Sequence, residues 1–189
     1  MLLSLLLLIP FLGAMALILW PGSPSSARLR DVSIVLLVVQ CLASFALLLP
    51  FDAADAGLQL VEQARWVRAI GLDYALALDG LSLPLVLMNG VLRLVAAIAS
   101  RTIENRPRVY FALLLVISGA VNGAFLAQNL LLFFLFYELE LIPLWMLIAV
   151  WGGANRAYAA TKFLIVTAVS GVLILGAFLG IALVTGTMD

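Results

Sequence analysis

The chain has 189 residues, of which 66% are hydrophobic and 11% charged, and ten basic and ten acidic side chains give a formal net charge of zero. Its mean hydropathy is +1.23. Soluble domains average roughly half apolar and a quarter charged residues, so this composition excludes a soluble globular domain and indicates an integral membrane protein. Histidine is absent and Cys41 is the single cysteine, which excludes an internal disulfide and makes a redox cofactor or metal on this chain unexpected.

Six segments are apolar enough to cross a bilayer as helices. A span needs about 20 mostly apolar residues to cover about 30 Å of hydrocarbon. The first segment has no basic region of the kind that begins a cleavable signal peptide, so we interpret it as a span. The sequence therefore predicts one all-α membrane domain over residues 1–189, a polytopic transmembrane helix bundle with spans at Leu2–Trp20, Val32–Leu49, Leu81–Ser100, Val109–Ala127, Leu130–Val150 and Phe163–Thr185.

The loop from Pro50 to Gly80 is too long for a simple turn. In its second half the larger apolar side chains alternate with small or acidic ones, at Leu72, Tyr74, Leu76 and Leu78. A period of two is typical of an extended strand. The pattern favours a small β-hairpin on the outer surface, and the alternative is an irregular cover over the bundle.

Basic residues are distributed unequally between the two ends of the predicted bundle. Two lie in the long loop, Arg65 and Arg68, together with several carboxylates. Short cytoplasmic loops carry an excess of lysine and arginine, which predicts an N-terminus on the non-cytoplasmic side. Seven basic residues follow the odd-numbered spans: Arg28, Arg30, Arg101, Arg106, Arg108, Arg156 and Lys162.

Two carboxylates, Glu138 and Glu140, lie near the middle of the fifth span. An acidic residue at bilayer depth costs roughly 2.5 to 3.5 kcal/mol on insertion scales and therefore usually serves an interior site. Two residues turn a helix by about 200°, so the two side chains cannot face one site. Pro143 leaves the carbonyl of Leu139 without its helical partner, and that carbonyl can hold water beside a buried carboxylate.

A proton relay is the functional interpretation of these carboxylates. Burial favours the neutral carboxyl group and a nearby cation favours the charged one, so a Glu–Lys pair of variable distance can take up and release a proton. The alternative is that each glutamate only makes hydrogen bonds to neighbouring helices or subunits. From the residues alone, neither Glu138 nor Glu140 can be preferred.

Candidate cations are few. Lys162 opens the predicted sixth span, where it serves either the relay or anchoring at the cytoplasmic surface. Arg93 lies within the third span and either extends its side chain to the interface or pairs with a carboxylate inside the bundle.

Two further groups of residues have a structural reading and a functional one. The glycines of the last span, including Gly171 and Gly176, are more typical of close helix packing than of a site. The amides Asn122, Gln128 and Asn129 are expected to cap a turn, with a polar path as the alternative.

Several motifs resemble one family. They are Phe134–Leu144 (FLFYELELIPL), Trp151-Gly152-Gly153, Ala159–Phe163 (AATKF) and Asp79–Leu85 (DGLSLPL). Together they resemble the antiporter-like membrane subunits of respiratory complex I, and among these subunit 4, the NuoM/NdhD family. The double-glutamate motif and Phe125–Leu130 (FLAQNL) are most similar to cyanobacterial NAD(P)H-quinone oxidoreductase chain 4, in the versions found in CO2-uptake complexes.

The resemblance implies a proton-translocating subunit of an NAD(P)H- or ferredoxin-plastoquinone oxidoreductase, in a cyanobacterial thylakoid or bacterial inner membrane. Quinone and NAD(P)H or ferredoxin would bind to other subunits, so this chain is not an enzyme alone. Its partners would be other membrane subunits and the lipid bilayer, with no nucleic acid. By motif position Glu138 is the proton-exchanging residue, paired in the family with a lysine on a broken seventh span, and Glu140 is an additional carboxylate.

The chain departs from the family in length and at Arg93. Members have about fourteen spans built as inverted repeats, whereas six are predicted here, so we expect the N-terminal part of such a subunit or a truncated relative. A neutral residue is expected in the family at the position of Arg93. Two alternatives to proton pumping stay open, a non-pumping structural membrane subunit and a subunit of a multisubunit cation/proton antiporter.

Overall fold

The computed structural model describes residues 1–67 and 70–188, and its six helices are each long and apolar enough to cross a membrane. The predicted all-α class is confirmed, and the chain is an integral multi-pass membrane protein. The described helices and strands, in chain order, are α1 (Leu2–Leu19), α2 (Ser26–Ala46), β1 (Gln59–Val67), β2 (Leu72–Leu78), α3 (Ser82–Ala99), α4 (Pro107–Leu126), α5 (Leu130–Trp151) and α6 (Arg156–Thr185).

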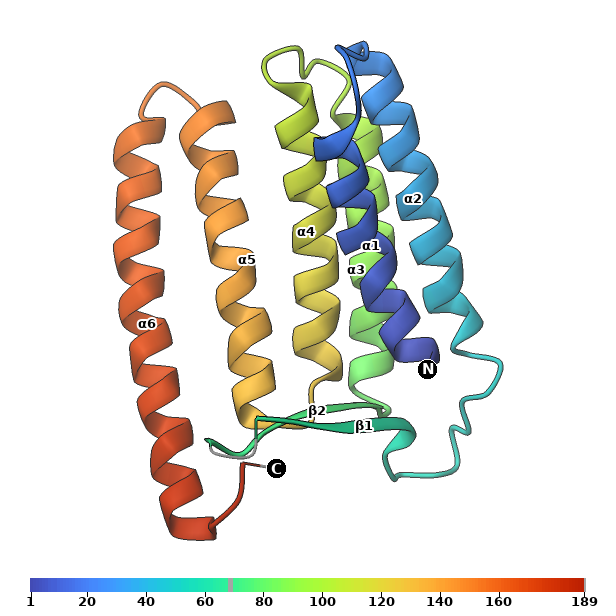
Figure 1. The fold of residues 1–189 in the computed structure, drawn as a ribbon, viewed down its shortest axis with the longest axis vertical. Helices are drawn as coiled ribbons and strands as arrows, with labels where there is room; N and C mark the ends of the chain where they lie inside the picture. Colours follow the sequence, from blue (N-terminus) through green and yellow to red (C-terminus); the bar gives the residue numbers. More distant parts are fainter. Residues whose placement is uncertain (68–69, 189) are drawn as a thin grey trace.

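The helices alternate in direction and place two kinds of connection at opposite ends (Figure 1). The α1–α2, α3–α4 and α5–α6 connections share one end, which we call the basic end because most of the basic residues lie in or beside it. The β1–β2 hairpin and the α4–α5 turn share the other, the hairpin end. Arg65 lies in β1 at the hairpin end, and Arg68 falls outside the described residues.

Two helices, α2 and α6, begin well before their apolar segments predict. Helix α2 begins at Ser26 rather than Val32, and the Ser25 side chain accepts a hydrogen bond from the backbone amide of Arg28. Helix α6 begins at Arg156, so Lys162 lies within this helix instead of opening it. Hydropathy finds the segment that belongs in hydrocarbon, whereas a helix continues into polar sequence until a cap or turn ends it.

Helices α1 to α4 form the packed part of the molecule. Helix α4 is the most enclosed of the six, because 61% of an 18-residue apolar stretch of this helix is buried. Near the basic end its Phe111 and Leu115 are fully buried beside Leu17 of α1 and Leu37 of α2. A second apolar cluster lies near the hairpin end, and its fully buried members include Leu3, Leu6, Leu76, Leu78 and Leu126.

The predicted hairpin is confirmed, with β1 and β2 antiparallel and Arg65 opposite Asp73. It is attached to the start of α1, because the Glu62 carboxylate accepts hydrogen bonds from the backbone amides of Leu3 and Ser4 at 2.9 and 3.1 Å. Partial burial opposes ionisation of Glu62, but the Met1 ammonium, the Ser4 hydroxyl and these amides outweigh it and lower the pKa of Glu62 below its ordinary value.

The start of α3 is held by a similar cap. The Asp79 carboxylate accepts hydrogen bonds from the backbone amides of Ser82 and Leu81, at 2.6 and 3.0 Å. The bond from the Ser82 amide is the main cause of a lowered pKa of Asp79, which partial burial only partly opposes. Two acidic residues of the long loop, Glu62 and Asp79, therefore accept hydrogen bonds at the starts of α1 and α3 and hold these helices at the hairpin end of the bundle.

Helix α5 is attached at both ends. At the hairpin end, the Gln128 backbone amide donates to the Ala75 carbonyl at 2.9 Å, and the Asn129 side-chain amide donates to the Gly71 carbonyl at 3.0 Å. Asn129 also caps α5 by accepting from the Leu132 amide, which confirms the expected capping role. At the basic end, the Trp151 indole donates to the Asn105 carbonyl at 2.9 Å.

Helix α6 packs mainly against α5 and is otherwise exposed along its length (Figure 1). Only 6% of an 18-residue apolar stretch of α6 is buried, and the buried residues of this helix are Ala160 and Gly171. Helix α6 is therefore covered on one side only, and Gly171 lies in its contact with α5.

Candidate functional site

The Glu138 carboxylate lies at the contact between α5 and α6. Its side chain is partly buried, and within the described part of the chain its buried Oε1 atom has no hydrogen-bond partner. Native proteins almost always satisfy buried polar atoms, and those left unsatisfied require a particular explanation. Nε2 of Gln40 and Nδ2 of Asn122 are also buried without a partner in the described chain, but of these three groups the carboxyl group of Glu138 is the one that can take up or release a proton.

Gly171 makes the space that this carboxylate occupies. A Cβ atom built on Gly171 would collide with Oε1 of Glu138, so any larger residue would displace the carboxylate or separate the two helices. A Cβ atom on Gly176, also in α6, would meet no atom of the described chain within 4 Å. Close packing was the expected role of Gly171, but the group packed against it is a carboxylate, which sequence spacing alone did not reveal.

Glu140 faces a different part of the molecule. It is partly buried, and Arg93 of α3 is a charged group that influences it electrostatically, without a direct ion-pair contact between the two in the described residues. This agrees with the predicted separation of about 200° around the helix. The two carboxylates of α5 therefore belong to two environments, one beside Gly171 and one facing the α3–α4 side.

Arg93 is directed toward the hairpin end of the bundle. Its Nε atom donates to Oδ1 of Asn89 at 3.1 Å, and Asn89 lies one turn closer to the hairpin on α3. A side chain extending to the nearer, basic end would point the other way. Of the two readings of Arg93, the structure therefore supports an interaction inside the bundle.

A cluster of buried amides lies behind Arg93. Asn89 donates to Oδ1 of Asn122 at 2.8 Å and to the backbone carbonyl of Ser118 at 3.1 Å. The Ser118 hydroxyl donates to Oε1 of Gln40 at 2.8 Å, which extends the cluster to α2. Asn122 is thus an interior residue of this cluster rather than the cap of a turn.

Lys162 is remote from Glu138. Its side chain is exposed, and its ammonium lies 5.7 Å from the centre of the Tyr158 ring. Nine residues of α6 separate Lys162 from Gly171, about 13 Å along a helix. The structure brings Glu138 and Gly171 into contact. Arg93 influences Glu140 electrostatically without an ion-pair contact in the described residues, and Lys162 is not brought to either carboxylate.

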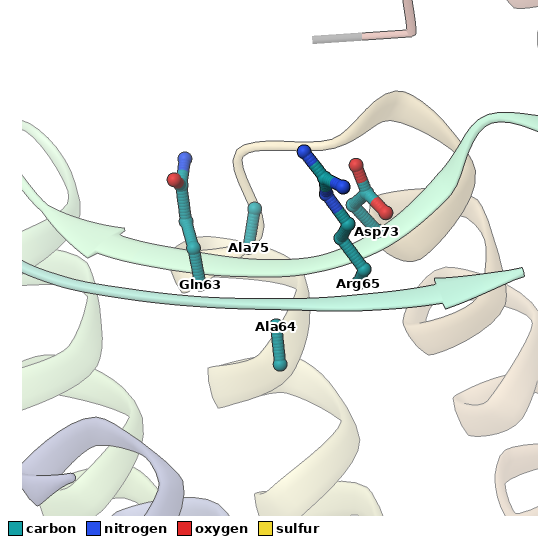
Figure 2. A pocket seen from close by; sticks show the side chains of 5 residues that line it. All are labelled: Gln63, Ala64, Arg65, Asp73 and Ala75. Atoms are coloured by element: carbon teal, nitrogen blue, oxygen red, sulfur yellow. The ribbon is translucent and has the colours of Figure 1, made fainter. Parts of the chain in front are cut away.

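A hollow of about 360 Å³ lies on the face of the hairpin that points away from the helices (Figure 2). Figure 2 shows Gln63, Arg65 and Asp73 pointing into it, while Ala64 points toward the bundle. It holds one basic and one acidic side chain, opposite each other in the hairpin register. This surface is far along the chain from the α5 carboxylates, and the described residues that line it do not pair a nucleophile with a base.

Sequence reasoning missed the contact of Gly171 with Glu138 and the hydrogen bonds that hold Arg93. A usable signal was present for Asn89, because it precedes Arg93 by four residues and so lies on the same helix face. The pairing of Asn89 with Asn122 had no local signal, since these residues come from different spans.

The chain matches known membrane proteins in sequence. Residues 127–189 match the family described as NADH:quinone oxidoreductase/Mrp antiporter, transmembrane. NAD(P)H-quinone oxidoreductase chain 4 1 of Synechococcus elongatus is 44% identical over 182 residues, which cover 94% of this chain and 33% of the relative. Chain 4 2 of Trichodesmium erythraeum is 47% identical over 133 residues, which cover 70% of this chain and 24% of the relative.

Solved structures agree with these matches. A chain of respiratory complex I from Thermus thermophilus superposes with a TM-score of 0.84 and 29% identity, over 100% of this chain and 38% of that chain. The chain belongs to the family of antiporter-like membrane subunits of complex I and Mrp. A chain of the Mrp complex from Dietzia shares the fold, with a TM-score of 0.79 and 22% identity over 98% of this chain and 20% of that chain.

The chain spans about a third of the length of the Synechococcus relative. The family assignment therefore covers these six helices, homologous to the corresponding part of the NuoM/NdhD subunits. Its cyanobacterial relatives are subunits of an NAD(P)H-quinone oxidoreductase.

Proposed function

We propose that the chain is a proton-translocating membrane subunit of a complex I-like NAD(P)H- or ferredoxin-plastoquinone oxidoreductase, coupling electron transfer to proton pumping. The observation that carries this proposal is the Glu138 carboxylate, whose buried Oε1 atom lies in the middle of a span and has no hydrogen-bond partner among the described residues. Structural carboxylates in membranes pair with other groups, whereas ones that exchange protons must be free to change partners. Family membership supports the same function.

In this proposal Glu138 is neutral while it holds a proton and releases it when a cation approaches, because a nearby positive charge favours the carboxylate form. Lys162 is too remote from Glu138 to be that cation without a large movement. We therefore assign the cation to a lysine outside the six spans described here. Glu140 and Lys162 have no proton-carrying part in this scheme.

The surrounding assembly follows from the same proposal. The residues 1–189 would form one membrane domain at the beginning of a longer unit, packed against other membrane subunits. Quinone and NAD(P)H or ferredoxin would bind elsewhere in that assembly. The excess of basic residues at one end supports an N-terminus outside the cytoplasm, and the cyanobacterial relatives support a thylakoid or bacterial inner membrane.

Substitution of Glu138 by glutamine tests the proposal directly. Glutamine keeps the size and polarity of the side chain but cannot release a proton, so we expect pumping by the purified, reconstituted complex to fall at least about a hundredfold with assembly retained. Glu104→Gln is the matched control, because Glu104 is exposed in the α3–α4 connection. Normal pumping by an intact Glu138→Gln complex would instead favour a non-pumping structural subunit.

A multisubunit cation/proton antiporter is the second candidate function. The family that residues 127–189 match includes Mrp antiporters, and the chain shares its fold with the Mrp chain, which favours this function. Purification of the intact complex separates the two. Quinone-reducing and iron–sulfur subunits should accompany the chain if it serves an oxidoreductase, and only small membrane subunits if it serves an antiporter.

A further inference from the structure

Three helices meet around a group of buried polar side chains, which we call the amide cluster: Gln40 of α2, Asn89 of α3, and Ser118 and Asn122 of α4. Gln40, Ser118 and Asn122 are fully buried, and Asn89 is 4% exposed. The proposed function gives these residues no part, because Glu138 lies at the contact between α5 and α6. Polar atoms inside a membrane bundle are costly unless each of them has a hydrogen-bond partner.

Arg93 determines which way the amides of the cluster are turned. A guanidinium has donors and no acceptor, so Asn89 must present its oxygen to Nε of Arg93, at 3.1 Å. The amide nitrogen of Asn89 then donates to Oδ1 of Asn122 at 2.8 Å and to the Ser118 carbonyl at 3.1 Å. Asn122 therefore has its oxygen toward Asn89, and its own nitrogen, Nδ2, is left for another partner.

Two buried amide nitrogens of the cluster are unsatisfied by the described residues. Neither Nδ2 of Asn122 nor Nε2 of Gln40 has a hydrogen-bond partner in this part of the chain. The oxygens of the same two amides are both used. Oδ1 of Asn122 accepts from Asn89, and Oε1 of Gln40 accepts from the Ser118 hydroxyl at 2.8 Å. The cluster therefore has a surplus of donors.

The hydrogen bonds of the cluster place the two amides about one helical turn apart. Gln40 is bonded to Ser118, and Asn122 follows Ser118 by four residues on the same face of α4. Side chains one turn apart are separated by about 5 to 6 Å at their Cβ atoms, and a water oxygen about 2.9 Å from each of two donors bridges such a gap. One small ligand can therefore reach both nitrogens.

Water is the ligand that this chemistry selects. Buried waters make about three hydrogen bonds, to polar groups that are otherwise unsatisfied. The two nitrogens supply donors, and the hydroxyls of Ser118 and Ser44 already donate to Gln40, so their oxygens are left to accept. A cation would face amide hydrogens, and an anion would lose its hydration without meeting a charge at these two nitrogens.

We propose that the side-chain amides of Gln40 and Asn122 bind a water molecule inside the bundle. This water joins α2 to α4, beside the direct hydrogen bond from Ser118 to Gln40. The site is independent of the proposed function, because Glu138 does not contribute to it.

Solid-state NMR of the isotope-labelled chain, in its complex and in lipid, tests the site. Magnetisation passes from bound water to an amide at hydrogen-bond distance, so Gln40 and Asn122 should receive about as much of it as a hydrated side chain does. Gln63 is the hydrated reference, because its side chain points into the hollow on the outer face of the hairpin (Figure 2). The backbone amide of Leu115, fully buried in an apolar cluster, is the dry reference.

Two matched substitutions show whether the amides share one water. Gln40→Met keeps the length of the side chain and removes its donor, so magnetisation transfer to Asn122 should fall about tenfold. Gln63→Met, the same change on the exposed hairpin, should leave that transfer unaltered. A density map of the complex gives the position, and the water oxygen should lie about 2.9 Å from both nitrogens.

Three results would overturn this site. Absence of transfer at Gln40 and Asn122, with normal transfer at Gln63, would mean that the two donors are dry. Unchanged transfer to Asn122 in Gln40→Met, with the Leu115 signal in its original place, would mean that the amides do not share a water. Density of an ion at the two nitrogens would assign the site to another ligand.

Discussion

The four-helix group α1–α4 and the pair α5–α6 differ in the hydrogen bonding and the chemistry of their buried polar side chains. In the first group the buried side chains of Gln40, Asn89, Ser118 and Asn122 are linked to one another, with Nε2 of Gln40 and Nδ2 of Asn122 left without a partner in the described chain. In the second, the buried Oε1 atom of Glu138 has no partner in the described chain. A linked polar cluster makes a fold rigid and specific, whereas a carboxyl group can exchange a proton and an amide cannot. The comparison therefore separates a scaffold, α1–α4, from a candidate site at Glu138.

The largest expected effect tests the scaffold half of this comparison. Phe111 in α4 is fully buried, and we expect Phe111→Ala to lower the free energy of unfolding by about 3 kcal/mol through lost packing. Phe178→Ala in α6 is the matched change, and it should cost about 1 kcal/mol because Phe178 is partly exposed and packs edge-on against Phe133. Both are measured by unfolding the purified protein in detergent, and equal losses would contradict the division.

An intermediate effect tests the site half. In Gly171→Ala the new methyl group meets the Glu138 carboxylate, so we expect pumping to fall about tenfold with assembly nearly unchanged. Gly176→Ala gains the same helix propensity but meets nothing, so it should pump normally. Proton uptake by proteoliposomes measures both variants, and equal rates would show that the carboxylate tolerates displacement.

The smallest effect concerns the hairpin that joins the two regions. Glu62→Gln replaces a charged acceptor at the start of α1, and we expect about 1 kcal/mol less protection of the Leu3 and Ser4 amides in hydrogen exchange. Glu104→Gln, an exposed change, serves as the control.

The same contact predicts a pH dependence. Because the folded-state pKa of Glu62 lies below its ordinary value, its stabilising contribution is complete above that ordinary value and is lost as the pH falls through the folded-state pKa. Protection at Leu3 should decrease on acidification in the unaltered protein and much less in Glu62→Gln. An identical pH profile in both would exclude Glu62 as the cause.

The sequence predicted the parts of this fold that depend on local pattern. Hydropathy located the six spans, the alternation at Leu72–Leu78 located β2, and the rotation per residue placed Glu138 and Glu140 on different sides of α5. It could not locate contacts between spans, because a membrane helix is apolar on every side and its pattern does not show which face meets which neighbour. The partners of Arg93 and the contact of Gly171 with Glu138 belong to that second class.

The attachment of α5 at both ends limits how its carboxylates can move. Its hairpin end is bonded to β2 and its basic end to the α3–α4 connection. A slide of one residue, about 1.5 Å along the axis, would break both attachments together. Movement of charge at Glu138 is therefore expected from rotation of its side chain, or from rearrangement of α6 around Gly171, while the α5 backbone stays in place.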